Sequence, residues 1–296
     1  MISIIITSFR EPKTIGKAIE SFISQEINED YELIVVAPDK ETLDVARTYQ
    51  KNHKTIKIFV DPGKGKSYAL NLLLPKLKSR VIILSDGDMY VGKNSVNALL
   101  KPFEDQKVGC ATGRPVSADD RNTLFGYWSH LLCDAGAHKA RLRRAKKEAF
   151  IECSGYIWAF RNNVIKEFPK DLPEDTIIPV IFWQRGYKIA YAPEAIGYVK
   201  FPNNLHDFLE QKKRTAKGHE ALHKYKQFRG AQRMKTLKNE IVEGWTALLY
   251  PRSLKEVFWT GLLIPLRLYI WILTFFHTKI KKQHYQDAWK RVESTK

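Results

Sequence analysis

The first 85 residues alternate between short apolar runs and amphipathic segments, and this alternation restricts the fold more than any other feature of the sequence. The opening run, "ISIII", is apolar and largely β-branched, as expected of a strand that is covered on both faces. The segment that follows has apolar residues at helical spacing. Strands that alternate with helices in this way indicate an α/β fold with a mostly parallel sheet flanked by helices. The predicted strands are 2–6, 31–37, 55–60 and 80–85, and the predicted helices are 13–25, 40–52 and 65–77.

The predicted strand at 80–85 leads directly into a pair of carboxylates, Asp86-Gly87-Asp88. Ionised carboxylates are costly to bury, and ligands of parallel sheets bind beyond the carboxyl ends of the strands. A hard divalent cation prefers such oxygen ligands and usually shares them with substrate phosphates. The pair therefore indicates a metal site at this edge, and an ordinary solvated Asp/Gly turn is the alternative.

Three segments together resemble the inverting family 2 glycosyltransferases of the GT-A fold. They are "IIITSFREPKTIGKAIESFISQ", "GKGKSYALN…RVIILSDGD" and "LPEDTIIPVIFWQRGYKIAYAPEA", and the resemblance extends over residues 1–218. It implies a GT-A (Rossmann-like) catalytic domain over 1–203. The half that binds the nucleotide sugar would be 1–118, and the half that binds the acceptor would be 119–203.

The resemblance also implies roles for individual residues. Asp88, together with Asp86, would hold Mn²⁺ or Mg²⁺ at the diphosphate of the donor. Asp175 is the expected catalytic base and Glu174 the second choice, although acidic residues at this position also cap helices. The residues expected to bind the donor nucleotide are Thr7, Ser8, Phe9, Glu11, Asp39, Lys66, Asn71 and Asp86.

Some positions depart from the family pattern. The second strand ends in "VVAPD" rather than in adjacent acidic residues, so uridine is the expected base on weaker grounds. A histidine that often follows the "PEA" strand is replaced by Val199 and Lys200. Gln211 and Arg214, in "QKKRT", resemble a Q-x-x-R-W element without its Trp. Lys200, Gln211 and Arg214 are candidates for contact with the pyrophosphate or the acceptor, and solvated basic side chains are the alternative.

The end of the chain is basic and then apolar. We expect a basic amphipathic helical segment at 204–243, followed by apolar membrane-associated helices and a basic tail at 244–296. Residues 257–276 are long enough to span a bilayer, but they contain Arg267 and Pro265. Pro265 predicts a kink or a break between two shorter helices. We therefore expect helices in the membrane interface, with a true span and a soluble packing helix as the alternatives.

The net charge of +17 indicates an anionic partner. The basic run "KARLRRAKK" at 139–147 would attract a lipid-linked phosphate or an anionic glycan, or would form a solvated loop. The three cysteines have no CxxC spacing, so a reducing compartment is expected.

Together these features predict a metal-dependent inverting glycosyltransferase at the cytoplasmic face of a membrane. It would transfer a sugar from a nucleotide-diphosphate donor, with UDP as the expected nucleotide, to a lipid-linked or glycan acceptor. A sugar nucleotidyltransferase and a basic nucleic-acid-binding protein are the alternatives. No nucleic acid is expected as a partner, since no recognisable reading module accompanies the cations. The sugar and the oligomeric state are left open.

Overall fold

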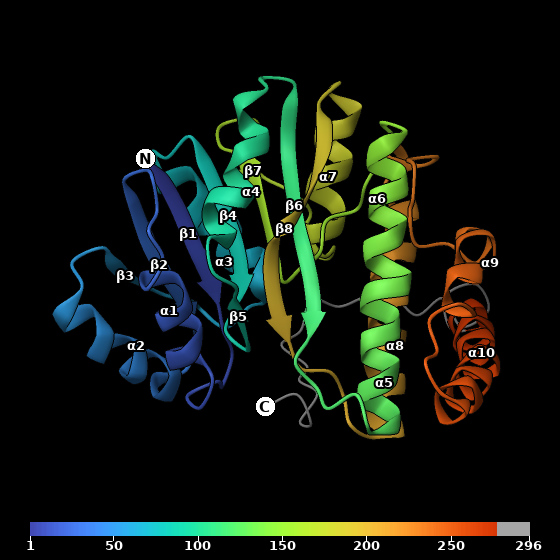
Figure 1. Ribbon diagram of the computed structural model, residues 1–296. Coiled ribbons are helices and arrows are strands. Elements are labelled where there is room, and N and C mark those ends of the chain that lie inside the picture. The colour runs from blue at the N-terminus through green and yellow to red at the C-terminus, as the bar shows by residue number, and fades with distance from the viewer. Residues whose placement is uncertain (277–296) are drawn as a thin grey trace.

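One eight-stranded sheet organises the protein, for which a computed structural model describes residues 1–276. The strand order is β3-β2-β1-β4-β7-β6-β8-β5 (Figure 1). Strands β1 to β4 pair in parallel, as do β6 and β8, whereas β7 and β5 pair antiparallel with their neighbours. The predicted α/β fold with a mostly parallel sheet is confirmed. The strands are β1 (Ile2–Thr7), β2 (Tyr31–Ala37), β3 (Ile56–Val60), β4 (Val81–Asp86), β5 (Met89–Val91), β6 (Val108–Ser117), β7 (Ile157–Arg161) and β8 (Lys188–Val199).

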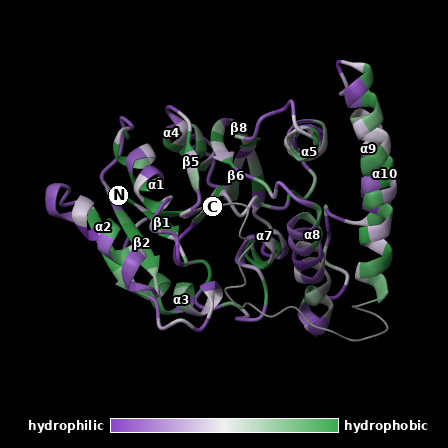
Figure 2. Cartoon of the chain, turned by 90° about the horizontal axis from the view of Figure 1, so that it is seen from below, coloured by the Kyte–Doolittle hydropathy of each residue, from purple (hydrophilic) through white to green (hydrophobic). Residues whose placement is uncertain are grey.

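Helices cover both faces of the sheet because the central strands are apolar on both sides. Within β1, Ile4 packs toward α1, α2 and α4, whereas Ile5 packs toward α3 and α7. Figure 2 shows α1 and α4 on one side of the sheet and α3 and α7 on the other. These helices are α1 (Ile15–Ile23), α2 (Lys40–Asn52), α3 (Lys66–Leu73), α4 (Ser95–Leu100) and α7 (Glu174–Gln184).

A second group of helices lies beside the sheet. α5 (Leu124–Leu131) continues through a π-helical stretch, Leu132–His138, into α6 (Lys139–Lys146), and the three form one column (Figure 1). This column packs against α8 (Leu205–Glu220) and α10 (Leu254–Phe275) through a separate apolar cluster. The buried members of that cluster are Tyr127, Trp128, Leu131, Phe208, Leu263 and Ile270.

The helix within the predicted basic segment 204–243 is shorter than expected. α8 ends at Glu220, two single 3₁₀ turns follow, and α9 (Leu237–Gly244) begins only later. Leu222 and Phe228 are buried against the cluster under α3 and α7, which requires the chain to turn after α8. Gly230 then takes a positive φ of 79°, a conformation that a glycine adopts without strain.

The sequence predicted a kink or a break at Pro265, and the break was wrong, because α10 is continuous across the proline. Buried residues lie on both sides of it, Thr260 and Leu263 before it and Ile270 and Thr274 after it. Packing therefore outweighs the hydrogen bond that Pro265 cannot donate. Residues 277–296, which include the end of the predicted apolar region and the basic tail, lie outside the described residues.

Candidate active site

The predicted site residues of the first strand and of the aspartate turn lie next to each other. β1 and β4 are parallel neighbours, and their register places Thr7 opposite Asp86. The Thr7 hydroxyl donates a hydrogen bond to Asp86 Oδ1 at 3.1 Å. The sheet thus brings the loop after β1 and the Asp86-Gly87-Asp88 turn together at its carboxyl edge, where ligands of such sheets bind.

Gly87 makes the close approach between these two segments possible. Its N–H donates to the Thr7 carbonyl at 2.9 Å. A Cβ at this position would lie 2.4 Å from Ser8 Oγ and 2.7 Å from Glu11 Oε2. Ser8 in turn donates to Glu11 Oε2 at 2.6 Å, and both side chains are nearly buried. Only glycine fits between the carboxylates of the turn without displacing this pair.

Two predicted donor residues have structural partners. Asp39 caps α2 by accepting the Thr42 N–H at 3.0 Å, and it also accepts the Arg10 N–H at 2.7 Å. The Asn71 side-chain amide donates to the Phe168 carbonyl at 2.8 Å. Contacts of Asp39 and Asn71 with a nucleotide stay predictions. Phe9, in the loop after β1, packs its ring against the Arg10 guanidinium at 5.3 Å.

Lys66 connects the aspartate turn with the beginning of α7. Its Nζ lies 2.7 Å from Asp86 Oδ1 and 2.6 Å from Glu174 Oε1, and its side chain is only 14% exposed. Burial by itself would lower the pKa of Lys66, but the charges of Asp86 and Glu174 raise it well above its ordinary value. Lys66 is therefore a fixed cation between two carboxylates from different segments.

The two acidic residues that open α7 have different surroundings. Glu174 is ion-paired with Lys66, whereas Asp175 has no cation within 4 Å in the described part of the chain. Burial raises the pKa of Asp175, and Lys235 and Lys66 counteract that effect only in part. Asp175 Oδ2 faces the backbone at Gly155, where a Cβ would lie 3.0 Å away. The two carboxylates thus differ in their ion pairing, and the role of Asp175 as the base stays a prediction.

Sequence reasoning missed three residues at this site, namely Tyr156, Glu152 and Lys235. Burial raises the pKa of the Tyr156 hydroxyl, the charges of Asp88 and Asp86 raise it further, and Arg214 opposes them. Glu152 is 1% exposed and accepts the N–H of Met234 at 2.8 Å. A lone glutamate inside the apolar run "FIECSGYIWAF" was a signal for Glu152, whereas nothing local distinguishes Tyr156 or Lys235.

Arg214 and the aspartate turn both affect the pKa of Tyr156, and the contact of Arg214 with the pyrophosphate or the acceptor stays a prediction. Gln211, one turn earlier on α8, has a buried Oε1 that makes no hydrogen bond within the described residues. Lys200 is exposed immediately after β8. In the antiparallel pairing of β5 with β8, Met89 lies opposite Val199, so the same register continued by one residue brings Lys200 opposite Asp88.

Asp86 and Asp88 fit a hard divalent cation by the chemistry of their oxygens. Within residues 1–276, no group of three or more His, Cys, Asp or Glu side chains is placed to hold a metal ion. An ion at this turn would therefore take its other ligands from the donor phosphates and from water, as Mg²⁺ and Mn²⁺ commonly do. Val199, the residue opposite Met89, offers no oxygen or nitrogen in its side chain for such an ion.

A parallel sheet with paired carboxylates at its carboxyl edge, together with an acidic pair opening a facing helix, defines a GT-A-like nucleotide-binding fold. The family model described as "Glycosyltransferase like family 2" matches residues 1–218, and the chain belongs to this family.

The chain is similar to several curated proteins. The N-acetylglucosaminyltransferase of Bradyrhizobium diazoefficiens is 22% identical over 239 residues, 73% of this chain and 48% of that protein. The probable glycosyltransferase YdaM of Bacillus subtilis is 25% identical, over 74% of this chain and 55% of its own length. The poly-beta-1,6-N-acetyl-D-glucosamine synthase of Staphylococcus epidermidis is 21% identical over 75% and 55%. The chain thus spans about half the length of these relatives.

Solved structures share the fold. The mannosyltransferase PcManGT of Pyrobaculum calidifontis, in complex with GDP-Man and Mn²⁺, superposes with a TM-score of 0.62 at 16% identity. The match covers 95% of this chain and 80% of that one. S. aureus TarS in complex with UDP-GlcNAc gives a TM-score of 0.52 at 15% identity, over 93% and 79%. These likenesses confirm the GT-A-like fold.

Proposed function

We propose that the protein is a metal-dependent inverting glycosyltransferase that uses a nucleotide-diphosphate sugar. The observation that supports this most is the chain of carboxylates and cation that runs from Asp86 through Lys66 to Glu174, with Asp175 beside it. An acceptor oxygen would attack the anomeric carbon while Asp175 takes its proton. The bond from that carbon to the β-phosphate oxygen breaks, and the nucleoside diphosphate leaves with the electron pair.

The charge that develops on the leaving group determines what the other residues do. A divalent ion, when bound at the turn, supplies positive charge at the diphosphate. Lys66 orients Asp86 for that ion and holds Glu174 in an ion pair, so the proton of the acceptor goes to Asp175. The names of the relatives include N-acetylglucosaminyl transfer, and the similar structures contain both GDP-Man and UDP-GlcNAc. Because these two ligands differ in their base, our proposal of uridine rests on the sequence segments alone.

Calorimetric titration with UDP, GDP, CDP and dTDP, each with and without Mn²⁺, tests this function. We expect one diphosphate to bind only with the metal, and Asp88→Ala to remove that binding, because a carboxylate ligand of the ion is lost. Asp44→Ala is the matched control, since Asp44 is a half-exposed aspartate that pairs with Arg47 on α2. Binding that ignores both Mn²⁺ and Asp88 would make the aspartate turn a structural feature.

The two alternatives predict other results. A nucleotidyltransferase would release pyrophosphate from a nucleoside triphosphate in the presence of a sugar phosphate. A nucleic-acid-binding protein would shift DNA or RNA in a salt-sensitive way that Asp88→Ala leaves unchanged.

We further propose that the protein acts at the cytoplasmic surface of a membrane, with α10 lying in the interface. α10 is the one helix within residues 1–276 that is long and apolar enough to cross a bilayer. One side of α10 is bonded to the catalytic domain: Trp128 Nε1 donates to the Trp259 carbonyl at 2.7 Å. Arg267, near the middle of α10, pairs with Glu240 of α9 at 2.6 Å. These contacts favour a helix that lies along the domain over one that leaves it to span.

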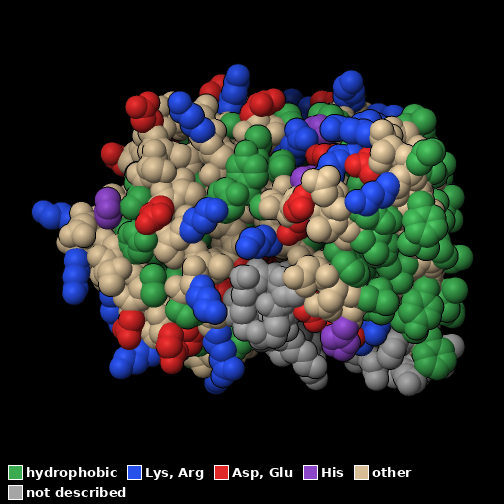
Figure 3. Space-filling view, turned by 60° about the horizontal axis from the view of Figure 1, so that its bottom comes forward, with side chains coloured by type: hydrophobic (Ala, Val, Ile, Leu, Met, Phe, Trp, Pro, Cys, Tyr) green, Lys and Arg blue, Asp and Glu red, His purple; other side chains and the backbone are tan. Residues whose placement is uncertain are grey.

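The outward side of α10 is apolar and adjoins a similar surface of α9. Figure 2 colours much of α10 as hydrophobic, and Figure 3 shows hydrophobic side chains gathered at this edge of the molecule. An apolar surface of this extent on a soluble protein marks an interaction site. The exposed apolar side chains are Ile241, Val242, Trp245, Leu248, Leu249, Leu254, Val257, Phe258, Leu262, Ile264, Leu268, Tyr269, Ile272 and Phe275.

Replacing Phe258 by Glu tests this surface. Phe258 is 65% exposed, and burial of a Phe side chain contributes about 1.5–3 kcal/mol. We therefore expect Phe258→Glu to weaken binding to vesicles of phosphatidylcholine and phosphatidylglycerol by roughly tenfold or more. Vesicle sedimentation measures the change, with Val60→Glu as the control, because Val60 is 60% exposed at the end of β3. Equal binding of the two variants would contradict the interfacial role of α10.

A further inference from the structure

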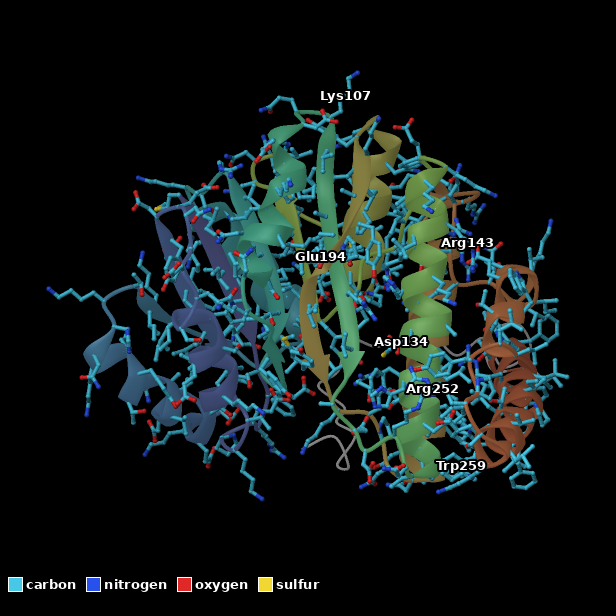
Figure 4. The ribbon with its side chains drawn as sticks, viewed as in Figure 1. Lys107, Asp134, Arg143, Glu194, Arg252 and Trp259 are labelled. Carbon is cyan, nitrogen blue, oxygen red and sulfur yellow. The ribbon has the colours of Figure 1, made fainter. Side chains whose placement is uncertain are left out.

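A basic cluster consists of Arg114 of β6, Arg141 of α6 and Lys212 of α8, and the donor site does not account for it. Arg114 of β6 reaches the column, where its Nη2 donates to Asp134 Oδ1 at 3.0 Å. Figure 4 shows Asp134 between the sheet and the column. Asp134 lies in the π-helical stretch Leu132–His138, an irregularity that is frequently found at functional sites.

Arg141, in the basic run "KARLRRAKK", is the most unusual member of the cluster. The run forms α6, and Arg141 is only 2% exposed, so the run is not the solvated loop that the sequence left open. Arg141 Nε donates to the Glu152 carbonyl at 3.2 Å. Its Nη1 is buried and makes no hydrogen bond within the described part of the chain. A buried guanidinium nitrogen without an acceptor is costly, which indicates that an anionic group completes the site.

Lys212 of α8 lies beside aromatic rings. Its Nζ lies 5.3 Å from the centre of the Phe208 ring and 5.6 Å from that of Phe201, and the structure records no carboxylate within 4 Å of it among residues 1–276. Burial, together with the nearby charges of Arg267 and Lys235, lowers the pKa of Lys212 to about 8. The charges of Lys212 and Arg141 both lower the pKa of the buried Cys133 thiol, whereas burial raises it, to about 12 overall. The two cations thus share one neighbourhood.

The carboxylates near the cluster are engaged by other groups. Asp134 binds Arg114 and also accepts the Tyr250 hydroxyl at 2.8 Å. Glu240 accepts two hydrogen bonds from Arg267 and one from Trp271. Within residues 1–276, neither Arg141 nor Lys212 therefore forms an ion pair with these carboxylates.

The cluster connects the candidate base with the apolar surface of α9 and α10. Lys235 Nζ lies 3.9 Å from Glu152 Oε2, and the charge of Lys235 lowers the pKa of both Asp175 and Lys212. Lys212 lies over the Phe201 ring, which packs edge-on against Tyr156. Arg267, which also acts on Lys212, belongs to α10, and α8 packs directly against α10. An anion held at Lys212 and Arg141 is accordingly placed between the reacting centre and the proposed membrane surface.

We propose that Arg141, Lys212 and Arg114 bind the phosphate group of the acceptor, and that this acceptor is a lipid-linked sugar phosphate whose sugar supplies the reacting hydroxyl and whose lipid chain lies toward α10. The inference rests on the proposed glycosyl transfer, for which it names the acceptor class. The phosphate is held and does not react. An acceptor hydroxyl still attacks the anomeric carbon, Asp175 takes its proton and the nucleoside diphosphate leaves. Phosphate recognition by guanidinium and ammonium groups of this kind is charge-assisted and strong.

Binding of geranyl phosphate to the full-length protein tests the site. The titration contains neither nucleotide nor metal, so its outcome is independent of the nucleoside diphosphate titration. We expect Lys212→Met to weaken binding by roughly tenfold or more, since a hydrogen bond to a charged group is lost. Lys212→Arg should retain binding. Lys213→Met is the matched control, because the adjacent Lys213 instead pairs with Glu210.

The ligands of the titration distinguish the sources of the phosphate. We expect geranyl phosphate to bind more tightly than inorganic phosphate and geraniol, because both the anion and the chain contribute. Inorganic phosphate that binds as tightly would overturn the lipid assignment, and geraniol that binds as tightly would overturn the anion site. Equal affinities for the Lys212→Met and Lys213→Met variants would overturn the whole proposal. Only variants whose thermal unfolding matches that of the wild type are compared. If Lys212→Met fails this requirement, Lys212→Arg is tested instead, and loss of binding in that variant would overturn the proposal.

Discussion

Replacing Asp175 by Asn is expected to lower the turnover of sugar transfer by roughly 10²–10⁴-fold, the usual contribution of a general base. The change keeps the shape of the side chain, and the donor diphosphate is held by other residues, so binding of the nucleoside diphosphate should be unchanged. Asp175 is assigned this role because it pairs with no cation of residues 1–276, whereas Glu174 lies 2.6 Å from Lys66. Steady-state transfer rates, together with the calorimetric affinity for the diphosphate, measure the two effects separately.

The pH dependence of transfer gives a second readout of the same assignment. A base must be ionised, and burial raises the pKa of Asp175 above its ordinary value of 3.8. Activity of the wild type should therefore fall as the pH is lowered through this raised pKa, at a higher pH than for an exposed aspartate. In Asp175→Asn the residual activity should lose this acid limb. Full activity of the variant would exclude Asp175 as the base and return the role to Glu174.

Local sequence patterns predicted the elements of the sheet well, because each pattern is set by the residues of one segment. The apolar run at 31–37 became β2 over the same residues, and the helix at 40–52 became α2. Elements that tertiary packing controls were predicted less well. The cationic segment after 204 turns away at Glu220 because Leu222 and Phe228 find places in the core. α10 stays continuous at Pro265 for the same kind of reason.

At the candidate site too, some residues were predictable from the sequence and others were not. Thr7, Ser8, Glu11 and the aspartate turn were predicted to lie together, and the parallel register of β1 and β4 places them so. The ion pairs of Lys66 depend on how β4 and α7 face each other, and no spacing along the chain reveals them. Arg141 was indistinguishable from its neighbours in a basic run, although α6 buries that one side chain. Its burial depends on contacts with a distant segment, at Glu152.

Lys66 joins the two sides of the site, and its removal should have the largest effect on stability. We expect Lys66→Met to lower the free energy of unfolding by about 3–5 kcal/mol, the usual cost of breaking a buried pair and leaving its partners charged. Chemical denaturation at neutral pH measures the loss. Lys64→Met, which removes an exposed lysine two residues earlier, should change stability by no more than about 0.5 kcal/mol.

A second substitution and the pH dependence distinguish loss of the ion pair from loss of packing. Lys66→Met combined with Glu174→Gln should recover part of the stability, because the neutral amide no longer leaves a charge without its partner. Burial already raises the pKa of Glu174 in the folded protein. Without Lys66 this pKa rises further, so the folded state of the variant takes up protons at a higher pH than the unfolded state. Its deficit relative to the wild type should therefore shrink as the pH is lowered from neutral. A deficit that is independent of pH and unchanged by Glu174→Gln would mean that Lys66 stabilises the protein by packing alone, and its role in orienting Asp86 would lose its support.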